Sequence, residues 1–303
     1  MATANSIEIF ETYHRSTSPQ PAIRPFPLYQ LDGIEMVVFD VYGTLFVSAA
    51  GEPSAVLQKP AKSNTTNAAF SRALSDAGFE ANDALVDFVA TAFRAEIEEF
   101  HVKHSGGAER PRERAEVDIR RIWESVIDKA DRAGLVSRSI AAGEGIESLA
   151  MRYECLANPV STMPGAAETL EKLHNHGLDL GIVSNAQFFT PIFLEHLLGK
   201  SYDLIPADRC IYSYQVGRAK PDPRVFHRLL AAAPRTSPPS LLYVGNDMLN
   251  DVATAQEAGL RACLFAGDTR SLRLREHHPL VKSRRPDTTV CRLNELLVVL
   301  GVE

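Results

Sequence analysis

The stretch Met36-Val-Val-Phe-Asp40-Val-Tyr-Gly-Thr44 decides the fold of this chain of 303 residues. It is a short, continuous apolar run that ends in a carboxylate. Such a run is typical of a strand that is buried on both faces of a parallel sheet. Gly43 permits a tight turn directly after it, so we expect Asp40 to project from the carboxyl end of the strand.

Strands and helices alternate in the second half of the chain. Further strands are predicted at residues 179–184, 209–212, 241–245 and 262–265 and near 289–290. Helices are predicted between them at residues 163–173, 191–198, 223–233 and 250–258. Strand–helix alternation implies crossover connections, so the sequence predicts an α/β fold with a doubly wound parallel sheet and a Rossmann-like core.

Residues 64–157 have a different character, and we call them the helical insert. Apolar residues recur at spacings of three and four, as in Ile119, Ile122 and Trp123, without strand-like alternation. Helices are expected at residues 67–74, 84–100, 113–133 and 137–155. The sequence therefore predicts an all-helical domain, inserted into a core made of residues 35–63 and 158–303.

Residues 1–34 are predicted to be an N-terminal extension. Pro19-Gln-Pro21 and Pro25-Phe-Pro27 exclude a long helix there. We expect this segment to be draped on the core or partly disordered.

The composition excludes several classes of protein. A net charge of −6 argues against a nucleic-acid partner. No apolar run approaches the roughly 18 residues of a membrane span, and no secretory signal is visible. The four scattered cysteines form no C-x-x-C pair, which argues against a disulfide framework or a zinc site. We expect a cytoplasmic protein without a membrane partner; whether two copies form a homodimer stays open.

Polar residues directly follow three of the predicted strands. A further polar segment lies in the loop before a predicted helix. In such sheets the reactive site lies at the carboxyl edge. Thr44 offers a hydroxyl and a backbone N–H near Asp40, and Ser184 and Asn185 end another strand. Lys220 stands before Pro-Asp-Pro and is a compact cation suited to phosphate or a carboxylate. Each segment taken alone is more typical of an ordinary turn.

The fourth segment runs from an apolar strand into Gly245-Asn246-Asp247 and on to Asp251. Carboxylate and amide oxygens suit Mg²⁺, which needs one or two carboxylates together with water and substrate oxygens. The alternative is that Asp247 and Asn250 cap the following helix.

Together the four segments resemble the signature motifs of the haloacid dehalogenase-like (HAD) hydrolase superfamily. The resemblance covers about residues 35–300 and rests on Asp40-x-x-Gly43-Thr44, Ser184, Lys220-Pro-Asp-Pro and Gly245-Asn-Asp-x-x-x-Asp251. It implies that the helical insert is the mobile cap of the family and that the substrate is a small molecule. It further implies that Asp40 attacks the substrate and forms an aspartyl intermediate that water hydrolyses.

The resemblance also assigns the binding groups. Thr44, Ser184, Asn185 and Lys220 are expected to bind the transferring group. In the phosphatases of the family Mg²⁺ contacts the nucleophile, the carbonyl two residues further on and fourth-motif acids. These positions fall on Asp40, Tyr42 and Asp247 or Asp251, with Asn246 as a further ligand.

Two departures from the motifs keep the reaction open. Family phosphatases carry a second Asp as a general acid where this chain has Tyr42, and such a loss typically forfeits roughly 10²–10⁴ in rate. Asp-x-Tyr-Gly-Thr is also found in the 2-haloacid dehalogenases, whose halide leaves without a proton. Their fourth motif, however, resembles Ser-Asn-x-x-Asp, without the acidic pair that remains here as Asp247 and Asp251.

We rank a Mg²⁺-dependent phosphatase first, a metal-independent 2-haloacid dehalogenase second and a non-catalytic binding module third. If Tyr42 replaces the general acid, Tyr42→Asp is expected to speed the hydrolysis of alkyl phosphates selectively.

Two further groups of residues are interpreted as structural. His101 and His104 have a spacing that suits a metal, but a solvated helix face is the better interpretation. Phe188, Phe189 and Phe193 follow the second motif, and core packing is favoured over a role in the pocket.

Overall fold

The computed structural model describes residues 4–21, 26–50, 64–104, 113–136 and 145–302. Its main feature is a six-stranded parallel sheet in the order β5-β4-β1-β6-β7-β8. The strands are β1 (Met36–Phe39), β4 (Asp179–Ser184), β5 (Cys210–Tyr212), β6 (Leu241–Gly245), β7 (Arg261–Phe265) and β8 (Thr288–Val290). The predicted α/β fold and its parallel sheet are confirmed.

The helices of the described residues fall into longer helices and single turns. The longer ones are α1 (Ala4–Tyr13), α3 (Asn64–Asp76), α4 (Asp83–His104), α5 (Ile119–Arg132), α7 (Ile146–Ala157), α8 (Ala166–Asn175) and α9 (Thr190–Leu198). Shorter helices are α10 (Ser213–Val216), α11 (His227–Ala232), α12 (Thr254–Glu257) and α13 (Glu295–Val299). The turns are η1 (Gly199–Ser201), η2 (Ala207–Arg209), η3 (Pro223–Phe226), η4 (Pro238–Ser240) and the π-helical η5 (Met248–Ala253).

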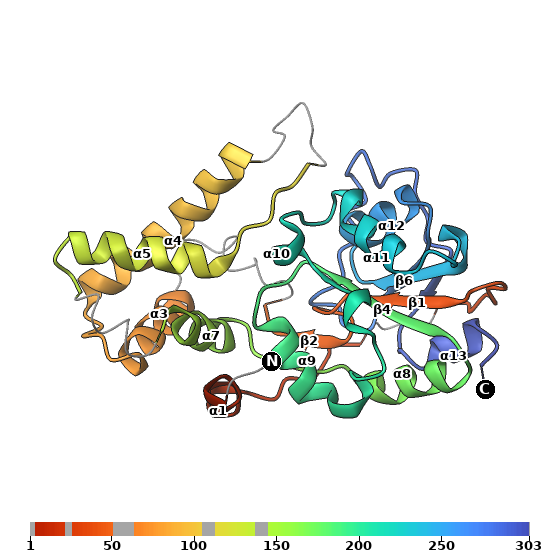
Figure 1. Cartoon of the computed structure of the whole chain (residues 1–303), viewed down its shortest axis with the longest axis horizontal. Helices are drawn as coiled ribbons and strands as arrows, with labels where there is room; N and C mark the ends of the chain where they lie inside the picture. Colours follow the sequence, from red (N-terminus) through yellow and green to blue (C-terminus); the bar gives the residue numbers. More distant parts are fainter. Residues whose placement is uncertain (1–3, 22–25, 51–63, 105–112, 137–144, 303) are drawn as a thin grey trace.

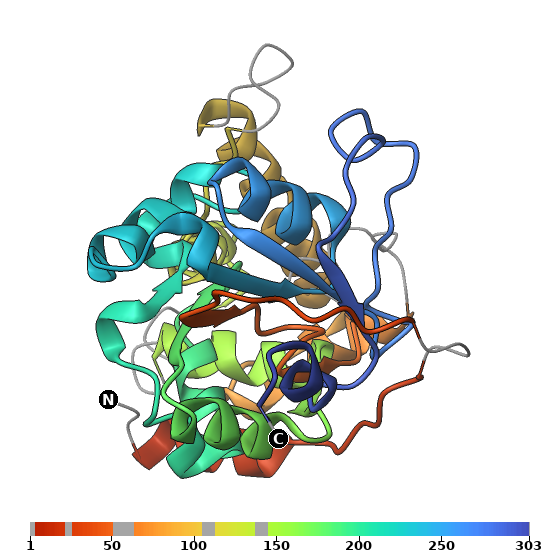
Figure 2. The same ribbon diagram turned by 90° about the vertical axis from the view of Figure 1, so that its right-hand side faces the viewer.

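Strand β1 lies in the middle of the sheet and is buried on both faces, which explains its continuous apolar run. Val37 and Phe39 belong to the core cluster that includes residues of α8 and α13. Met36 and Val38 belong to the cluster that includes residues of α11 and α12. Helices therefore cover both sides of the sheet, as Figure 2 shows.

A two-stranded antiparallel ribbon, which the sequence did not predict, flanks the helical insert. It pairs β2 (Phe46–Ser48) with β3 (Val160–Thr162), just before and just after the insert. Asn158 fastens this junction, because its Oδ1 accepts hydrogen bonds from Ser48 Oγ at 2.7 Å and from the N–H of Ala50 at 3.1 Å. Three-residue strands are too short for a reliable sequence periodicity.

The helical insert lies to one side of the sheet (Figure 1). Its helices α3, α4, α5 and α7 pack around Phe70, Phe93, Trp123 and Tyr153, whose ring centroids lie 4.2–5.8 Å apart in the contacting pairs. None of the described residues of the insert joins the six-stranded sheet. The predicted helix at residues 137–155 is described from residue 145 onward, and its earlier part lies outside the described residues.

The predicted helix at residues 113–133 begins too early. It starts at Ile119, with Asp118 as its N-cap, and the segment before it is extended. The N–H of Glu116 donates to the carbonyl of Gly217 at 3.1 Å, and the carbonyl of Arg114 accepts from Ala219 N–H at 3.0 Å. These bonds to the core compete with helix formation and attach the insert beside the third motif.

The N-terminal extension forms a helix before its prolines. Helix α1 contacts α7 of the insert and α9 of the core. Phe10 lies 4.7 Å from Phe193 between ring centroids, and Tyr13 OH accepts a hydrogen bond from Arg152 at 3.2 Å. Residues 4–13 therefore lie draped on the protein as a helix. None of the helices in the described ranges combines the length and the apolar character that a membrane span requires.

Candidate active site

The first, second and fourth motifs meet at the carboxyl edge of the sheet because β1 lies between β4 and β6. Phe39 is in register with Ile182 on one side and Val244 on the other. Asp40 follows β1, and its backbone N–H donates to the carbonyl of Val244 at 2.9 Å. The side chain of Asp40 is thus buried at the edge where the sequence predicted it.

Lys220 connects the motifs through contacts with three side chains, those of Asp40, Asp251 and Tyr243. We call these four residues the Lys220 network. Lys220 Nζ lies 2.9 Å from Asp40 Oδ1, 2.6 Å from Asp251 Oδ1 and 2.6 Å from the hydroxyl of Tyr243. Burial by itself lowers the pKa of Lys220, but the charges of Asp251 and Asp40 outweigh it and raise the pKa above its usual value. Lys220 therefore carries a positive charge beside Asp40.

Asn185 and Tyr243 position Lys220. The N–H of Lys220 donates to Asn185 Oδ1 at 2.7 Å, and Asn185 Nδ2 donates to the carbonyl of Lys220 at 3.0 Å. The hydroxyl of Tyr243 donates to the carbonyl of Val183 at 2.6 Å. Asn185 was predicted as a substrate ligand, and in the structure its amide holds the backbone of the lysine. Tyr243 was missed because a tyrosine within a buried strand has the pattern of a core residue.

Asp251, predicted as a metal ligand, has both oxygens engaged by the protein. Oδ1 contacts Lys220, and Oδ2 accepts from the N–H of Asp247 at 2.8 Å. Burial raises the pKa of Asp251 to about 7 although Lys220 opposes this. Gly245 is required beside it, because a Cβ there would lie 2.4 Å from Asp251 Cγ.

Asp247 caps η5 and pairs with Arg275. Its Oδ1 accepts from Leu249 N–H at 2.8 Å and Asn250 N–H at 3.2 Å. The guanidinium of Arg275 approaches both oxygens, with Nε 2.7 Å from Oδ1. Asp247 therefore caps the following helix, as the alternative interpretation of the sequence held. Arg275 was missed because it lies in a polar segment between β7 and β8 with no motif of its own.

The ligands of Mg²⁺ stay a prediction, and two of the predicted ones, Asp247 and Asp251, are ion-paired with Arg275 and Lys220 in the structure. Among the described residues, no group of three or more His, Cys, Asp or Glu side chains is arranged to hold a metal. Asp40, the carbonyl of Tyr42 and the amide oxygen of Asn246 lie at the ends of the adjacent strands β1 and β6. One carboxylate and two neutral oxygens fit a Mg²⁺ that keeps several waters and binds substrate oxygens.

Thr44 and Ser184 are fully buried at this edge. The hydroxyl of Thr44 donates to Asn246 Oδ1 at 3.3 Å, and Asn246 Nδ2 donates to the carbonyl of Ser271 at 2.6 Å. Ser184 Oγ has a long contact of 3.5 Å with the carbonyl of Asn185. The structure thus brings the predicted residues together, whereas their contacts with a substrate stay a prediction.

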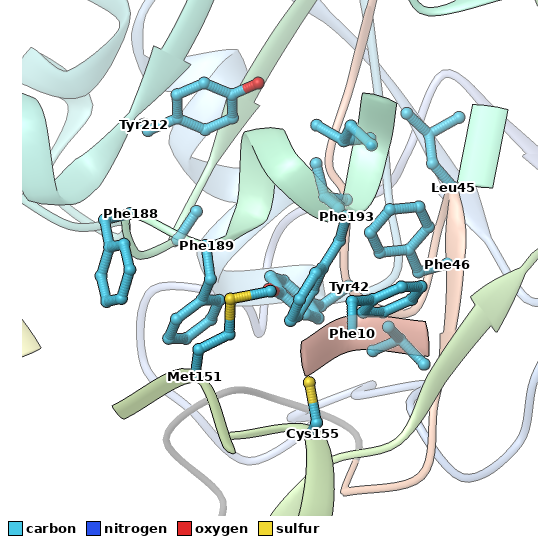
Figure 3. Close-up of a cluster of buried hydrophobic side chains, with 14 of the residues drawn as sticks. Phe10, Tyr42, Leu45, Phe46, Met151, Cys155, Phe188, Phe189, Phe193 and Tyr212 are labelled. Atoms are coloured by element: carbon cyan, nitrogen blue, oxygen red, sulfur yellow. The ribbon is translucent and has the colours of Figure 1, made fainter. Parts of the chain in front are cut away.

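Tyr42 packs into the core. Its hydroxyl lies 2.9 Å from Thr190 Oγ1, and its ring meets Phe46 edge-on at 6.0 Å. Figure 3 shows it within a cluster that includes Phe10 and Phe193. Burial, and then the charge of Glu154, raise the pKa of Tyr42 well above its usual value. The phenol is therefore a still weaker acid than a free tyrosine.

A cavity lies between the helical insert and the loop after β4, and we call it the insert cavity. Its volume is about 80 Å³, several times the roughly 10–15 Å³ that one water needs. Its walls are Phe93, Ile97, His101, Arg114, Glu116, Val117, Ile119, Trp123, Ala150, Tyr153, Glu154, Asn185, Ala186, Gln187 and Phe189.

Two interpretations of the sequence change at this cavity. His101 lines the cavity, so only the exposed His104 fits the predicted solvated face. Phe189 also lines the cavity, while Phe188 and Phe193 pack in the core as expected.

Comparison with known proteins agrees with the motifs. A family model for haloacid dehalogenase-like hydrolases matches residues 34–259. Haloacid dehalogenase-like hydrolase domain-containing protein 3 of Mus musculus is 32% identical over 118 residues, 38% of this chain and 45% of that protein. Phosphoglycolate phosphatase of Salmonella typhi is 30% identical over 141 residues, 46% of this chain and 51% of that enzyme. The chain thus spans about half the length of these curated relatives or less.

Two solved structures share the fold. The 2-haloacid dehalogenase of Pseudomonas syringae pv. Tomato DC3000 has a TM-score of 0.57 at 22% identity, covering 88% of this chain and 98% of that one. A HAD phosphatase of Thermococcus onnurineus has a TM-score of 0.51 at 20% identity, covering 89% and 99%. The family match extends over most of the sequence and includes all four motifs. The chain therefore belongs to the haloacid dehalogenase-like hydrolase family.

Proposed function

We propose that this hydrolase is a phosphatase that acts on a small phosphorylated metabolite through Asp40. The observation that carries the proposal is the buried Lys220 ammonium, which contacts Asp40 and Asp251 at 2.9 and 2.6 Å. Among the relatives, phosphoglycolate phosphatase and the ribulose-1,5-bisphosphate 5-phosphatase of Halopiger xanaduensis have names that support a phosphate ester.

In this proposal a carboxylate oxygen of Asp40 forms a bond to phosphorus while the ester P–O bond breaks. The leaving oxygen takes the bonding electron pair and acquires a proton. Water then attacks phosphorus of the aspartyl phosphate, which releases inorganic phosphate and restores the carboxylate. Lys220 offsets the negative charge that the phosphoryl oxygens bring beside Asp40.

The metal in this proposal is Mg²⁺, held by Asp40, the carbonyl of Tyr42 and Asn246. When bound, Mg²⁺ neutralises charge on the phosphoryl oxygens. Asp251 keeps Lys220 in place through its 2.6 Å contact, and Asp247 orders the start of η5 through its cap. In this arrangement the two acids act on protein groups, which revises the metal set predicted from the motifs.

The helical insert acts as a cap over this site in the same proposal. Gln187 of the core already holds it, since its side chain accepts from Ile119 N–H at 2.9 Å and donates to the carbonyl of Val117 at 2.8 Å. Opening of the cap has to break these bonds, and closure excludes water from Asp40.

The second candidate is a 2-haloacid dehalogenase, favoured by two observations. Position 42 supplies no carboxylic acid, and the phenol there is turned to Thr190. A halide leaves without a proton, so it needs no such group. The pairing of Asp247 with Arg275 also removes an acid that distinguishes the phosphatase motif.

The test is a panel of phosphorylated metabolites and 2-haloacids, assayed with added Mg²⁺ and with chelator. Phosphate release that requires Mg²⁺ supports the proposal. Halide release that is insensitive to chelator supports the dehalogenase. A folded protein that is silent in both assays supports a binding module.

A further inference from the structure

Four of the fifteen wall residues of the insert cavity are phenylalanine, tyrosine or tryptophan. Phe93 and Trp123 come from α4 and α5, Tyr153 from α7, and Phe189 from the core. Trp123 is the single tryptophan of the chain. Flat rings favour edge-to-face or offset contacts with another ring, so these walls match a planar apolar group.

Two wall residues have polar atoms without a hydrogen-bond partner among the described residues. They are Trp123 Nε1 and the hydroxyl of Tyr153, in side chains that are 0% and 3% exposed. Buried polar groups are usually paired, because an unpaired one costs about 1–3 kcal/mol. Both atoms have almost no accessible surface, so a ligand with an acceptor atom on its ring pairs with them only after the cavity wall adjusts.

The cavity reaches the catalytic edge through Asn185. This residue lines the cavity and also grips the backbone of Lys220 through two hydrogen bonds of 2.7 and 3.0 Å. Lys220 Nζ in turn lies 2.9 Å from Asp40. We therefore expect the ester substituent of a phosphate bound at Asp40 to extend toward the cavity.

Burial disfavours the charged forms of several ionisable groups around the cavity. Burial raises the pKa of Glu154 to about 7. Burial also raises the pKa of Glu116 and, with the charge of Arg114, lowers the pKa of His101. Arg114 is a cation in the cavity wall. A ligand with a carboxylate is therefore the class of ligand that competes with an uncharged one. The walls therefore suit an uncharged group better than a carboxylate.

We propose that the insert cavity receives an aromatic, uncharged leaving group, so that the substrate is an aryl phosphate; this inference rests on the proposed phosphatase function. Two independent features agree with it. The cavity supplies aromatic walls, and Tyr42, bonded to Thr190, supplies no acid. An aryloxide is a weaker base than an alkoxide, so it departs with the P–O electron pair and then takes its proton from water.

Ligand binding is measured first, separately from turnover. In Asp40→Asn, titration with phenyl phosphate is followed through the fluorescence of Trp123, with methyl phosphate and phosphoglycolate as comparators. Burial of a phenyl ring predicts binding at least about tenfold tighter than methyl phosphate, with a fluorescence change that methyl phosphate does not produce. Equal affinity for the two esters overturns the inference, and so does tighter binding of phosphoglycolate.

Variants of the wall locate the ligand. Ala150→Leu fills the cavity and should raise KM for phenyl phosphate at least about fivefold, while KM for acetyl phosphate stays within about twofold. Tyr153→Phe should weaken nitrophenyl phosphate more than phenyl phosphate. Tyr202→Phe is the matched control outside the cavity, and thermal melts verify the fold of each variant. Unchanged KM values in a folded Ala150→Leu contradict the inference.

The two proposals fail in different ways. If the wild type releases phosphate from acetyl phosphate but shows no preference for aryl esters, the cavity inference is wrong and the phosphatase stands. If Asp40→Asn binds phenyl phosphate tightly but the wild type hydrolyses no phosphate, the phosphatase and the aryl phosphate substrate are both wrong, and only the binding of an aromatic group in the cavity stands.

Discussion

The carboxyl edge of the sheet and the insert cavity contrast in how their polar groups are paired. At the edge, Lys220 contacts Asp40 and Asp251 and Arg275 contacts Asp247. In the cavity, Trp123 Nε1 and the Tyr153 hydroxyl have no partner within the described ranges. Groups that are already fixed suit charge stabilisation, because no reorganisation is needed during reaction. We expect a ligand that enters the cavity to supply the missing acceptors once the wall has adjusted around it.

The largest effect is expected for Asp40, the proposed nucleophile. Asp40→Asn should leave a folded protein with turnover reduced on the order of 10³-fold or more, because an amide cannot attack as a carboxylate does. Lys220 keeps Asp251 as its partner, so the fold persists. Turnover by initial rate and thermal unfolding check the two parts. Activity within tenfold of wild type would falsify the aspartyl mechanism. The carboxyl edge would then not be the place of the reaction, and its comparison with the cavity would lose its basis.

Lys220→Met should destabilise the protein, because it leaves the two buried carboxylates of Asp40 and Asp251 without their cation. Loss of one partner from such a buried network costs about 3–5 kcal/mol of unfolding free energy. The loss should be larger at pH 8 than at pH 5, because protonation of Asp251, whose pKa is already about 7, removes one of the charges.

Urea unfolding at the two pH values measures this loss. The double variant Lys220→Met/Asp251→Asn is the control and should recover part of it, since one charge is gone. A loss below 1 kcal/mol at pH 8 would show that water reaches the network and that its charges are not held by the protein.

The sequence predicted the sheet well because each long strand is buried and carries its own apolar run. It also placed Asp40, Ser184, Lys220 and Asp251 at one edge, since strand ends in a parallel sheet meet there. Local pattern carried no such information for the Tyr243 hydroxyl or the Arg275 guanidinium. Their roles depend on contacts with residues from other strands and motifs.

The helix that the sequence placed too early has the same origin. Residues 113–118 have a helical pattern, but hydrogen bonds to residues 217 and 219 hold them extended. Local pattern also gives no sign of the ion pairs of Asp247 and Asp251, because Arg275 and Lys220 are distant from them in sequence. The cavity arises where the insert meets the core, so no single segment of the sequence announces it.

Glu154→Gln tests whether the surroundings of the cavity disfavour a charged group, in contrast to the edge of the sheet. The variant should be more stable than the wild type at high pH. Glu154 is buried, and its pKa is raised by burial from 4.5 to about 7. The folded state therefore disfavours the carboxylate, with a cost that is full above pH 7 and disappears below pH 4.5. The amide keeps an acceptor for Asn158, so the variant should gain about 3 kcal/mol at pH 8 and little at pH 4.5.

Urea unfolding across this pH range measures the gain. Glu147→Gln on the same helix is the matched control, since the side chain of Glu147 is 61% exposed in a surface pair with Arg120, and it should change stability by less than about 1 kcal/mol. Equal pH profiles for wild type and Glu154→Gln would mean that the carboxylate is solvated, and the cavity would then tolerate charge.

The smallest effect is expected at Tyr42, which lies between the two regions. Tyr42→Phe removes the hydroxyl that contacts Thr190 at 2.9 Å, while Thr190 Oγ1 keeps its 3.3 Å contact with Gln187 N–H. Loss of one such bond costs about 0.5–1.5 kcal/mol. Turnover of aryl and alkyl phosphates should each stay within about twofold, because the packed phenol with its raised pKa donates no proton to the leaving group.

The same packing changes the expectation for Tyr42→Asp. A carboxyl there enters a cluster with Phe46 and Phe193, so it should lower stability by several kcal/mol rather than restore an acid. The ratio of aryl to alkyl turnover in Tyr42→Phe decides the question independently of stability. If that ratio rises tenfold, with alkyl esters alone slowed, Tyr42 supplies the proton after all. The insert cavity would then select its ligand by shape and hydrogen bonding alone. The basicity of the leaving oxygen would not contribute to the selection.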